Sequence, residues 1–114
     1  MRMVLNYQRT VKTLLTLPIK KQWFDMIAKG EKKEEYREIK PYYTVRFQNI
    51  GLLSKKTVNP TGDMLALILQ NGYGKDAPKM MAFVRLLIRK GKPEWGAEPG
   101  KTYYVLKILN WFPV

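Results

Sequence analysis

The segment Gly30-Glu31-Lys32-Lys33-Glu34-Glu35-Tyr36-Arg37 decides how the first half of this chain folds. It follows residues 19–28, whose apolar side chains recur at helical spacing, and Gly30 suits the left-handed conformation that ends a helix. Residues 32–39 are typical of a strand with charged side chains, which Pro41 ends. The segment therefore predicts a short helix, a capping glycine and a strand.

The same segment gathers charge at the start of that strand. Side chains alternate along a strand, so Glu35 and Arg37 are expected on one face. Lys32 joins this pair only if the chain bends directly after Gly30. Such a bend would place a proton-transfer pair and a phosphate-binding group together.

The rest of the chain contains further strands and few helical patterns. A proline-opened helical turn is expected at residues 41–47, and Pro18 is expected to end the first strand. With residues 32–39 included, five strands are expected, the others at residues 11–17, 64–69, 80–89 and 102–109. The predicted fold class is α+β: a mostly antiparallel sheet that curls or closes into a small barrel, with one or two short helices at its rim.

One domain accounts for the length of the chain. It has 114 residues and 46% hydrophobic content, enough to bury a core without a metal or a disulfide. We expect an N-terminal arm over residues 1–10 and a single domain over residues 11–114. The oligomeric state is left open.

Cysteine and histidine are absent, which removes several kinds of chemistry. Structural zinc sites and the Ser-His and Cys-His nucleophile pairs are excluded. We expect neither a metal nor a cofactor. A chain without cysteine suits the cytosol, and no apolar run approaches the roughly 20 residues of a membrane span. We therefore expect a cytoplasmic protein with no membrane partner.

The charge is strongly basic. Lysine and arginine number 21 against 9 aspartates and glutamates, a net charge of +12. This balance favours a polyanionic partner, with nucleic acid ahead of an acidic membrane surface, although a solvated basic surface is the plain alternative. The candidates for contact with a nucleic-acid backbone are Lys20, Lys21, Arg46, Arg85, Arg89 and Lys90.

Residues 17–47 resemble the signature of the ASCH domain family, a branch of the PUA-like barrels. Gly30, Lys32, Glu35 and Arg37 match its G-x-K-x-x-E-x-R motif at every defined position. The flanking segments at residues 19–27, 39–42, 95–96 and 103–105 are also similar, and together they cover about residues 11–110. The resemblance implies a barrel with a cleft beside the motif, and recognition of RNA or chemistry on nucleotides.

The resemblance also implies an enzymatic alternative. Some bacterial relatives are amidohydrolases that act on acetylated cytidine with a lysine, a threonine and a glutamate, and others are described as ribonucleases. Lys32 aligns with the catalytic lysine, Glu35 takes the position of the threonine, and Glu94 is a candidate for the glutamate.

The roles expected for the site residues follow from their chemistry. Lys32 and Glu35 are the catalytic candidates: the lysine transfers a proton or contacts phosphate, and Glu35 accepts from the lysine or from a base edge. The predicted nucleic-acid-binding residues are Lys21, Arg37, Tyr42, Tyr43, Arg46 and Trp95, with Arg37 forking onto phosphate and the aromatic rings stacking a base.

Each of these roles has a structural alternative. Glu35 and Arg37 can form a plain ion pair, Lys32 can be a solvated lysine, and aromatic residues are often core. Trp23 is assigned to the core, because it shares a helix face with other apolar residues.

Three functions remain open from the sequence. The first is an RNA-binding or nucleotide-binding module for single-stranded or modified RNA. The alternative is a small hydrolase on modified nucleosides or on RNA, working without a metal. A protein-interaction module without chemistry is the further alternative.

Overall fold

The structure is a computed structural model that describes residues 14–114. The arm expected over residues 1–10, and the start of the strand expected at 11–17, lie outside the described residues. The elements in chain order are β1 (Thr16–Ile19), α2 (Lys21–Ala28), β2 (Glu34–Arg37), α3 (Pro41–Ile50), β3 (Leu65–Asn71), β4 (Lys79–Lys90), the 3-10 helix η1 (Pro93–Trp95) and β5 (Thr102–Pro113).

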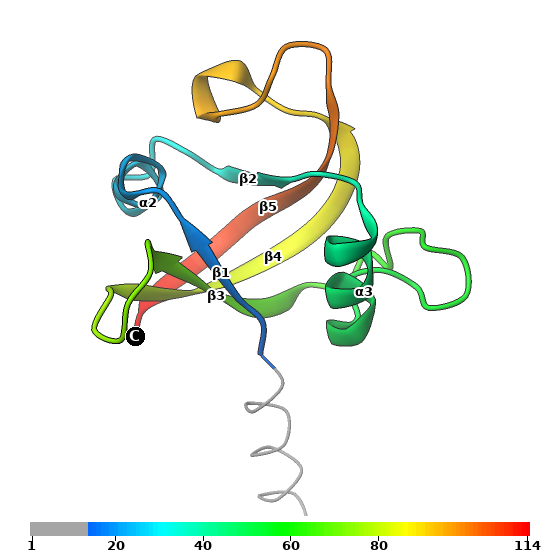
Figure 1. Ribbon diagram of the computed structural model, residues 1–114, viewed down its shortest axis with the longest axis horizontal. Helices are drawn as coiled ribbons and strands as arrows, with labels where there is room; N and C mark the ends of the chain where they lie inside the picture. The colour runs from blue at the N-terminus through cyan, green and yellow to red at the C-terminus, as the bar shows by residue number, and fades with distance from the viewer. Residues whose placement is uncertain (1–13) are drawn as a thin grey trace, which may run out of the picture.

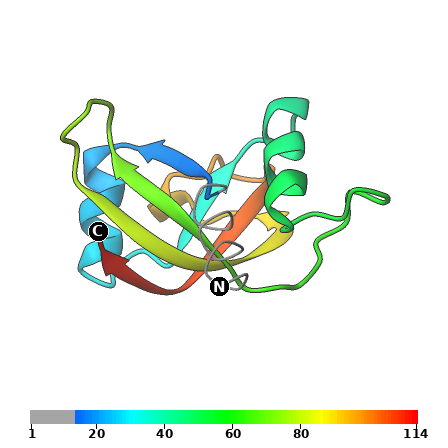
Figure 2. The ribbon, with the colours of Figure 1, turned by 90° about the horizontal axis from the view of Figure 1, so that it is seen from below.

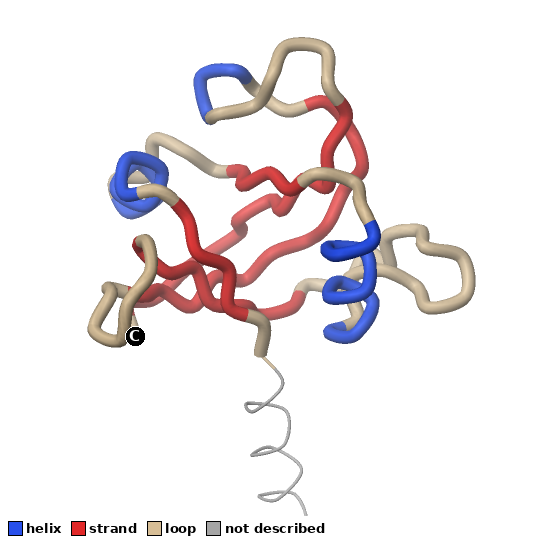
Figure 3. The backbone as a smooth tube through the Cα atoms, viewed as in Figure 1, coloured by secondary structure: helices blue, strands red, loops and turns tan. Residues whose placement is uncertain are grey.

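All five strands belong to one mixed sheet in the order β1-β3-β4-β5-β2. β1 runs parallel to β3, and every other pair is antiparallel. The sheet is strongly curved, and α2 and α3 lie at opposite ends of it (Figures 1 and 3), where both pack against the same core. The α+β class is confirmed. The sheet does not close, because β1 and β2 remain its two edges, so the expected barrel is not confirmed.

The two helices form where the sequence predicted helical structure. Ile27 of α2 is buried, and Trp23 and Phe24 on the same helix pack against the core. Gly30 ends this region with a φ of 77°, a conformation that glycine adopts without strain. α3 starts at Pro41 and extends to Ile50, further than the single turn expected.

The first strand differs from its prediction. Pro18 was expected to end it, but β1 runs from Thr16 through Pro18 to Ile19. The strand tolerates the proline because β1 is an edge strand, where a missing backbone N–H does not break a ladder on both sides.

The long antiparallel strands β4 and β5 form the centre of the sheet. β3 pairs with β4, and both β4 and β5 extend beyond the predicted strands to 12 residues each. Figure 2 shows the two strands curving together beneath the helices. A bulge interrupts their register between Phe83 and Val84, as is common where a strand must bend.

Apolar residues are buried on both faces of the sheet. The main core includes Phe47, Leu67 and Leu106, which have no measurable exposure. A smaller cluster on the other face joins Tyr36, Tyr103 and Val105 to Ala97 in the loop after η1. Among residues 14–114, no helix is long and apolar enough to cross a membrane.

Candidate functional site

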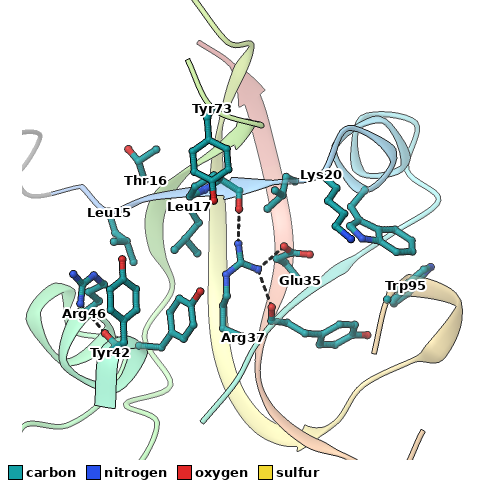
Figure 4. Close-up of a pocket in the computed structure, with 16 residues that line it drawn as sticks. Leu15, Thr16, Leu17, Lys20, Glu35, Arg37, Tyr42, Arg46, Tyr73 and Trp95 are labelled. Carbon is teal, nitrogen blue, oxygen red and sulfur yellow. Dashed lines mark hydrogen bonds and ion pairs between the residues drawn. The ribbon is translucent and has the colours of Figure 1, made fainter. Parts of the chain in front are cut away.

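A cleft of about 450 Å³ lies between the two edge strands of the open sheet. Its walls come from β1 and the start of α2, from β2, from α3, from the turn between β3 and β4, and from the loop that contains η1 (Figure 4). The volume falls within the range of roughly 300–1,000 Å³ that is usual for small-molecule sites.

Lys32 lies at a bend of the chain directly after Gly30. The backbone N–H groups of Glu31 and Lys32 both donate to the Met26 carbonyl, at 2.9 and 3.2 Å, which turns the chain after α2. Lys32 Nζ then lies 3.1 Å from Glu35 Oε1 and 2.5 Å from the Trp95 carbonyl oxygen. The condition for Lys32 to reach Glu35, a bend directly after Gly30, is therefore met.

Burial sets the chemistry of Lys32. Its side chain is 0% exposed, and its ammonium lies 4.9 Å from the Trp23 ring centre and 5.0 Å from that of Tyr36. Burial lowers the pKa of Lys32, and the carboxylate of Glu35 opposes that shift. Lys32 does not line the cleft, so a bound ligand would meet Glu35 before it met the amine.

Arg37 links the two edges of the sheet. Its Nη1 lies 2.5 Å from Glu35 Oε2 and donates to the Tyr36 carbonyl at 2.8 Å, and its Nη2 donates to the Pro18 carbonyl of β1 at 2.9 Å. Figure 4 shows these contacts crossing the cleft. The predicted pairing of Glu35 with Arg37 is confirmed, and the side chain is only 12% exposed. The guanidinium thus forms part of the cleft floor.

Aromatic rings and basic groups lie on both sides of Arg37. Trp95 and Lys20 lie toward one end of the cleft, and Tyr42 and Arg46 toward the other (Figure 4). The Trp23 ring lies beside Gly96, next to Trp95. The Arg46 guanidinium carbon lies 3.5 Å from the Tyr42 ring centre, close enough for a cation–π contact. Three basic side chains and one acidic side chain line the cleft, and the acid is already paired, so the cleft is electropositive.

Most of the predicted site residues come together here. Glu35, Arg37, Tyr42, Tyr43, Arg46 and Trp95 all line the cleft. Lys21 does not, because it is exposed on α2 and forms an ion pair with Asp25 at 2.6 Å. Glu94 is exposed on η1 and does not line the cleft either.

The other predicted backbone contacts also lie elsewhere, apart from Lys20. Arg85, Arg89 and Lys90 all belong to β4 and do not line the cleft. Arg89 forms an ion pair with Glu34, whose carboxylate also accepts a hydrogen bond from the Tyr36 hydroxyl at 2.8 Å. The two neighbouring glutamates of the motif therefore serve different networks.

Sequence reasoning missed two aromatic residues of the cleft. Trp23 is expected in the core and does pack against it, but its ring also lines the cleft, and a Cβ added at Gly96 would lie 3.0 Å from it. Tyr73 is 87% exposed in the turn between β3 and β4 and also lines the cleft. An exposed tyrosine between Gly72 and Gly74 was the signal available in the sequence, because glycines mark a turn at the surface.

Within the described part of the chain, no group of three or more acidic side chains is placed to hold a metal ion. The side chains that line the cleft include lysine, arginine, glutamate and aromatic groups. No protein-family model matches the chain, and searches of curated proteins and of solved structures find no match for it either.

Proposed function

We propose that the protein binds single-stranded RNA by taking one nucleotide into the cleft between β1 and β2. The observation that carries this proposal is the combination of aromatic rings and basic groups in one electropositive cleft. Single-stranded nucleic acid is usually bound in this way, by rings that stack on bases and by cations that meet phosphates. The net charge of +12 adds a general attraction for a polyanion.

The side chains divide into two roles under this proposal. Trp23 and Trp95 are partly exposed at one end of the cleft, where they offer ring surface to a base. Lys20 and Arg46 lie at the two ends and offer charge to the phosphates that flank it. Arg37 uses three of its five N–H donors within the protein, so up to two remain for a ligand.

The salt dependence of binding tests this proposal. Fluorescence anisotropy with a short labelled single-stranded RNA is expected to give an affinity that falls steeply as salt rises. Removal of the two cations assigned to phosphates, in Lys20→Ala with Arg46→Ala, should make the slope of log K against log salt shallower by about 1.4, roughly 0.7 for each lost phosphate contact.

The matched control removes the same charge elsewhere. Lys55 and Lys56 are exposed in the loop between α3 and β3 and do not line the cleft. The double variant Lys55→Ala with Lys56→Ala should leave the salt slope nearly unchanged. Equal effects of the two double variants would show that binding follows net charge and not the cleft, and would refute the proposal.

A hydrolase that acts on modified nucleosides or on RNA is the second candidate. The observation in its favour is a buried lysine with a lowered pKa, paired with a carboxylate that lines the cleft. Glu35 would face the substrate, with Lys32 controlling its protonation. Incubation with acetylated cytidine and with RNA, followed by chromatography, tests this candidate, and the absence of product from the intact protein would remove it.

Membership of the ASCH family, with its PUA-like barrel, is part of the same proposal. The support is the match of Gly30, Lys32, Glu35 and Arg37 to the family motif, together with the position of that motif beside a cleft. A structure of the protein with a bound nucleotide would test the family, the cleft and the ligand together.

A further inference from the structure

The ammonium of Lys32 is the point at which three segments of the cleft meet. Trp23 comes from α2, Glu35 and Tyr36 come from β2, and Trp95 comes from the loop after β4. The ammonium lies over the ring faces of Trp23 and Tyr36. It also binds the Glu35 carboxylate and the Trp95 carbonyl directly. No other described side chain has contacts of this kind with all three segments.

Lys32 also belongs to a chain of charged contacts that crosses the open side of the sheet. The chain runs from the Trp95 carbonyl to Lys32, then to Glu35 and Arg37, and ends at the Pro18 carbonyl of β1. No backbone ladder joins β1 to β2. Side chains therefore do what backbone hydrogen bonds do elsewhere in the sheet.

Side chains from outside the loop at residues 91–100 hold it at three places. Near its start, the Lys92 N–H donates to the Tyr36 hydroxyl at 2.9 Å, and further along, the Glu98 N–H donates to the Tyr103 hydroxyl at 2.9 Å. Between these two contacts, the Trp95 carbonyl accepts its hydrogen bond from Lys32. This bond holds the part of the loop that presents the Trp95 ring to the cleft.

We propose that Lys32 is the positioning residue of this cleft: its buried ammonium holds Trp95, Trp23 and Glu35 in place and does not itself contact the ligand. The motif lysine then acts as an internal brace, in contrast to the catalytic role expected from the sequence. The expectation that loss of Lys32 weakens RNA binding rests on the proposed function. The expectation that its loss loosens the loop at residues 91–100 does not.

Amide hydrogen exchange of the full-length protein tests the brace without any ligand. The N–H groups of Trp95, Gly96 and Ala97 all donate within the loop, so their exchange reports its opening. Lys32→Met keeps most of the apolar stem of the side chain and removes the ammonium group. Exchange in the peptide that covers residues 91–100 should rise roughly tenfold to a hundredfold, as expected when a hydrogen bond to a charged group is lost.

Two further variants make the test specific. Lys33→Met changes the neighbouring exposed lysine and should leave exchange of the loop unchanged. Glu35→Gln, which keeps its shape and weakens the hold on Lys32, serves if Lys32→Met does not fold. It should speed exchange of the same peptide by a smaller factor.

The outcomes separate this inference from the proposed function. Faster exchange of the loop, with little change in the β4 and β5 peptides, supports the role of Lys32 as a brace. If the intact protein also binds no RNA, only the proposed function fails. Unchanged exchange of the loop together with weaker RNA binding would mean that Lys32 meets the ligand itself. That result, or an equal rise in exchange across the whole sheet, would overturn the inference.

Discussion

Removal of the Arg37 guanidinium should weaken the open side of the sheet more than removal of any other cleft cation. Arg37→Met keeps the aliphatic stem and removes the ion pair with Glu35 and the bonds to the Tyr36 and Pro18 carbonyls. Glu35 keeps its contact with Lys32, so no carboxylate is left buried and unpaired. Pro18 and Tyr36 both line the cleft, so their freed carbonyl groups can regain water.

The expected magnitude follows from those three hydrogen bonds. At a net value of about 1 kcal/mol for each, Arg37→Met should lower the free energy of unfolding by about 3 kcal/mol. For a domain of this size, that corresponds to a fall in melting temperature of about 12 °C, at roughly 4 °C for each kcal/mol. Arg37→Lys keeps the charge but cannot fork between the two edges, so it should lose roughly half as much.

Urea titrations followed by tryptophan emission measure this loss, with the slope m expected to stay constant. Arg46→Met is the matched control, because within residues 14–114 Arg46 donates only to the Tyr42 carbonyl of its own helix, where the contact is exposed. The control should change the free energy of unfolding by about 0.5 kcal/mol at most. A loss below about 1 kcal/mol for Arg37→Met, or equal losses for the two variants, would refute the idea that Arg37 joins β1 to β2.

Phe47→Ala should lower the free energy of unfolding by about 3–5 kcal/mol, because Phe47 is fully buried between two tyrosine rings, and thermal denaturation checks this. Burial lowers the pKa of Lys32 in the folded protein, although the Glu35 carboxylate opposes this shift. Between that lowered pKa and the ordinary value of 10.5, the lysine is protonated in the unfolded chain more than in the folded protein. The intact protein should therefore gain stability as pH rises through that window, relative to Lys32→Met, in paired urea titrations; a constant difference would contradict this. Burial raises the pKa of Tyr36, so above about pH 10 the unfolded chain loses this proton before the folded protein does, and stability should fall as pH rises. Tyr36→Phe should remove this fall in the same titrations, and it also frees the Lys92 N–H.

The elements of the fold were largely predictable because they depend on local patterns. Helical spacing, Gly30 and Pro41 marked α2, the bend and the start of α3, and runs of β-branched and apolar residues marked β3, β4 and β5. The ends of β1 were not predictable in the same way. Pro18 stops a strand only if that strand has neighbours on both sides, and position in a sheet is not a local property.

Parts of the candidate site could also be read from the sequence. The alternation of β2 predicted the pair of Glu35 and Arg37, and the bend after Gly30 explained how Lys32 reaches them. The long-range partners of these residues could not be predicted. Trp95 and Pro18 are far from the motif in sequence, and only the curvature of the sheet brings their carbonyl groups to it.

The sequence alone determined that Lys32, Glu35 and Arg37 can come together, because their spacing matches a helix end followed by a strand. Only the tertiary structure decided what those groups do. It buried Lys32 beneath two aromatic rings, turned Arg37 toward both edges of the sheet, and left the cleft surface to Lys20, Arg46 and the aromatic residues. The physical reason is that burial and long-range hydrogen bonds depend on which strands become neighbours, and this is settled by packing over the whole chain.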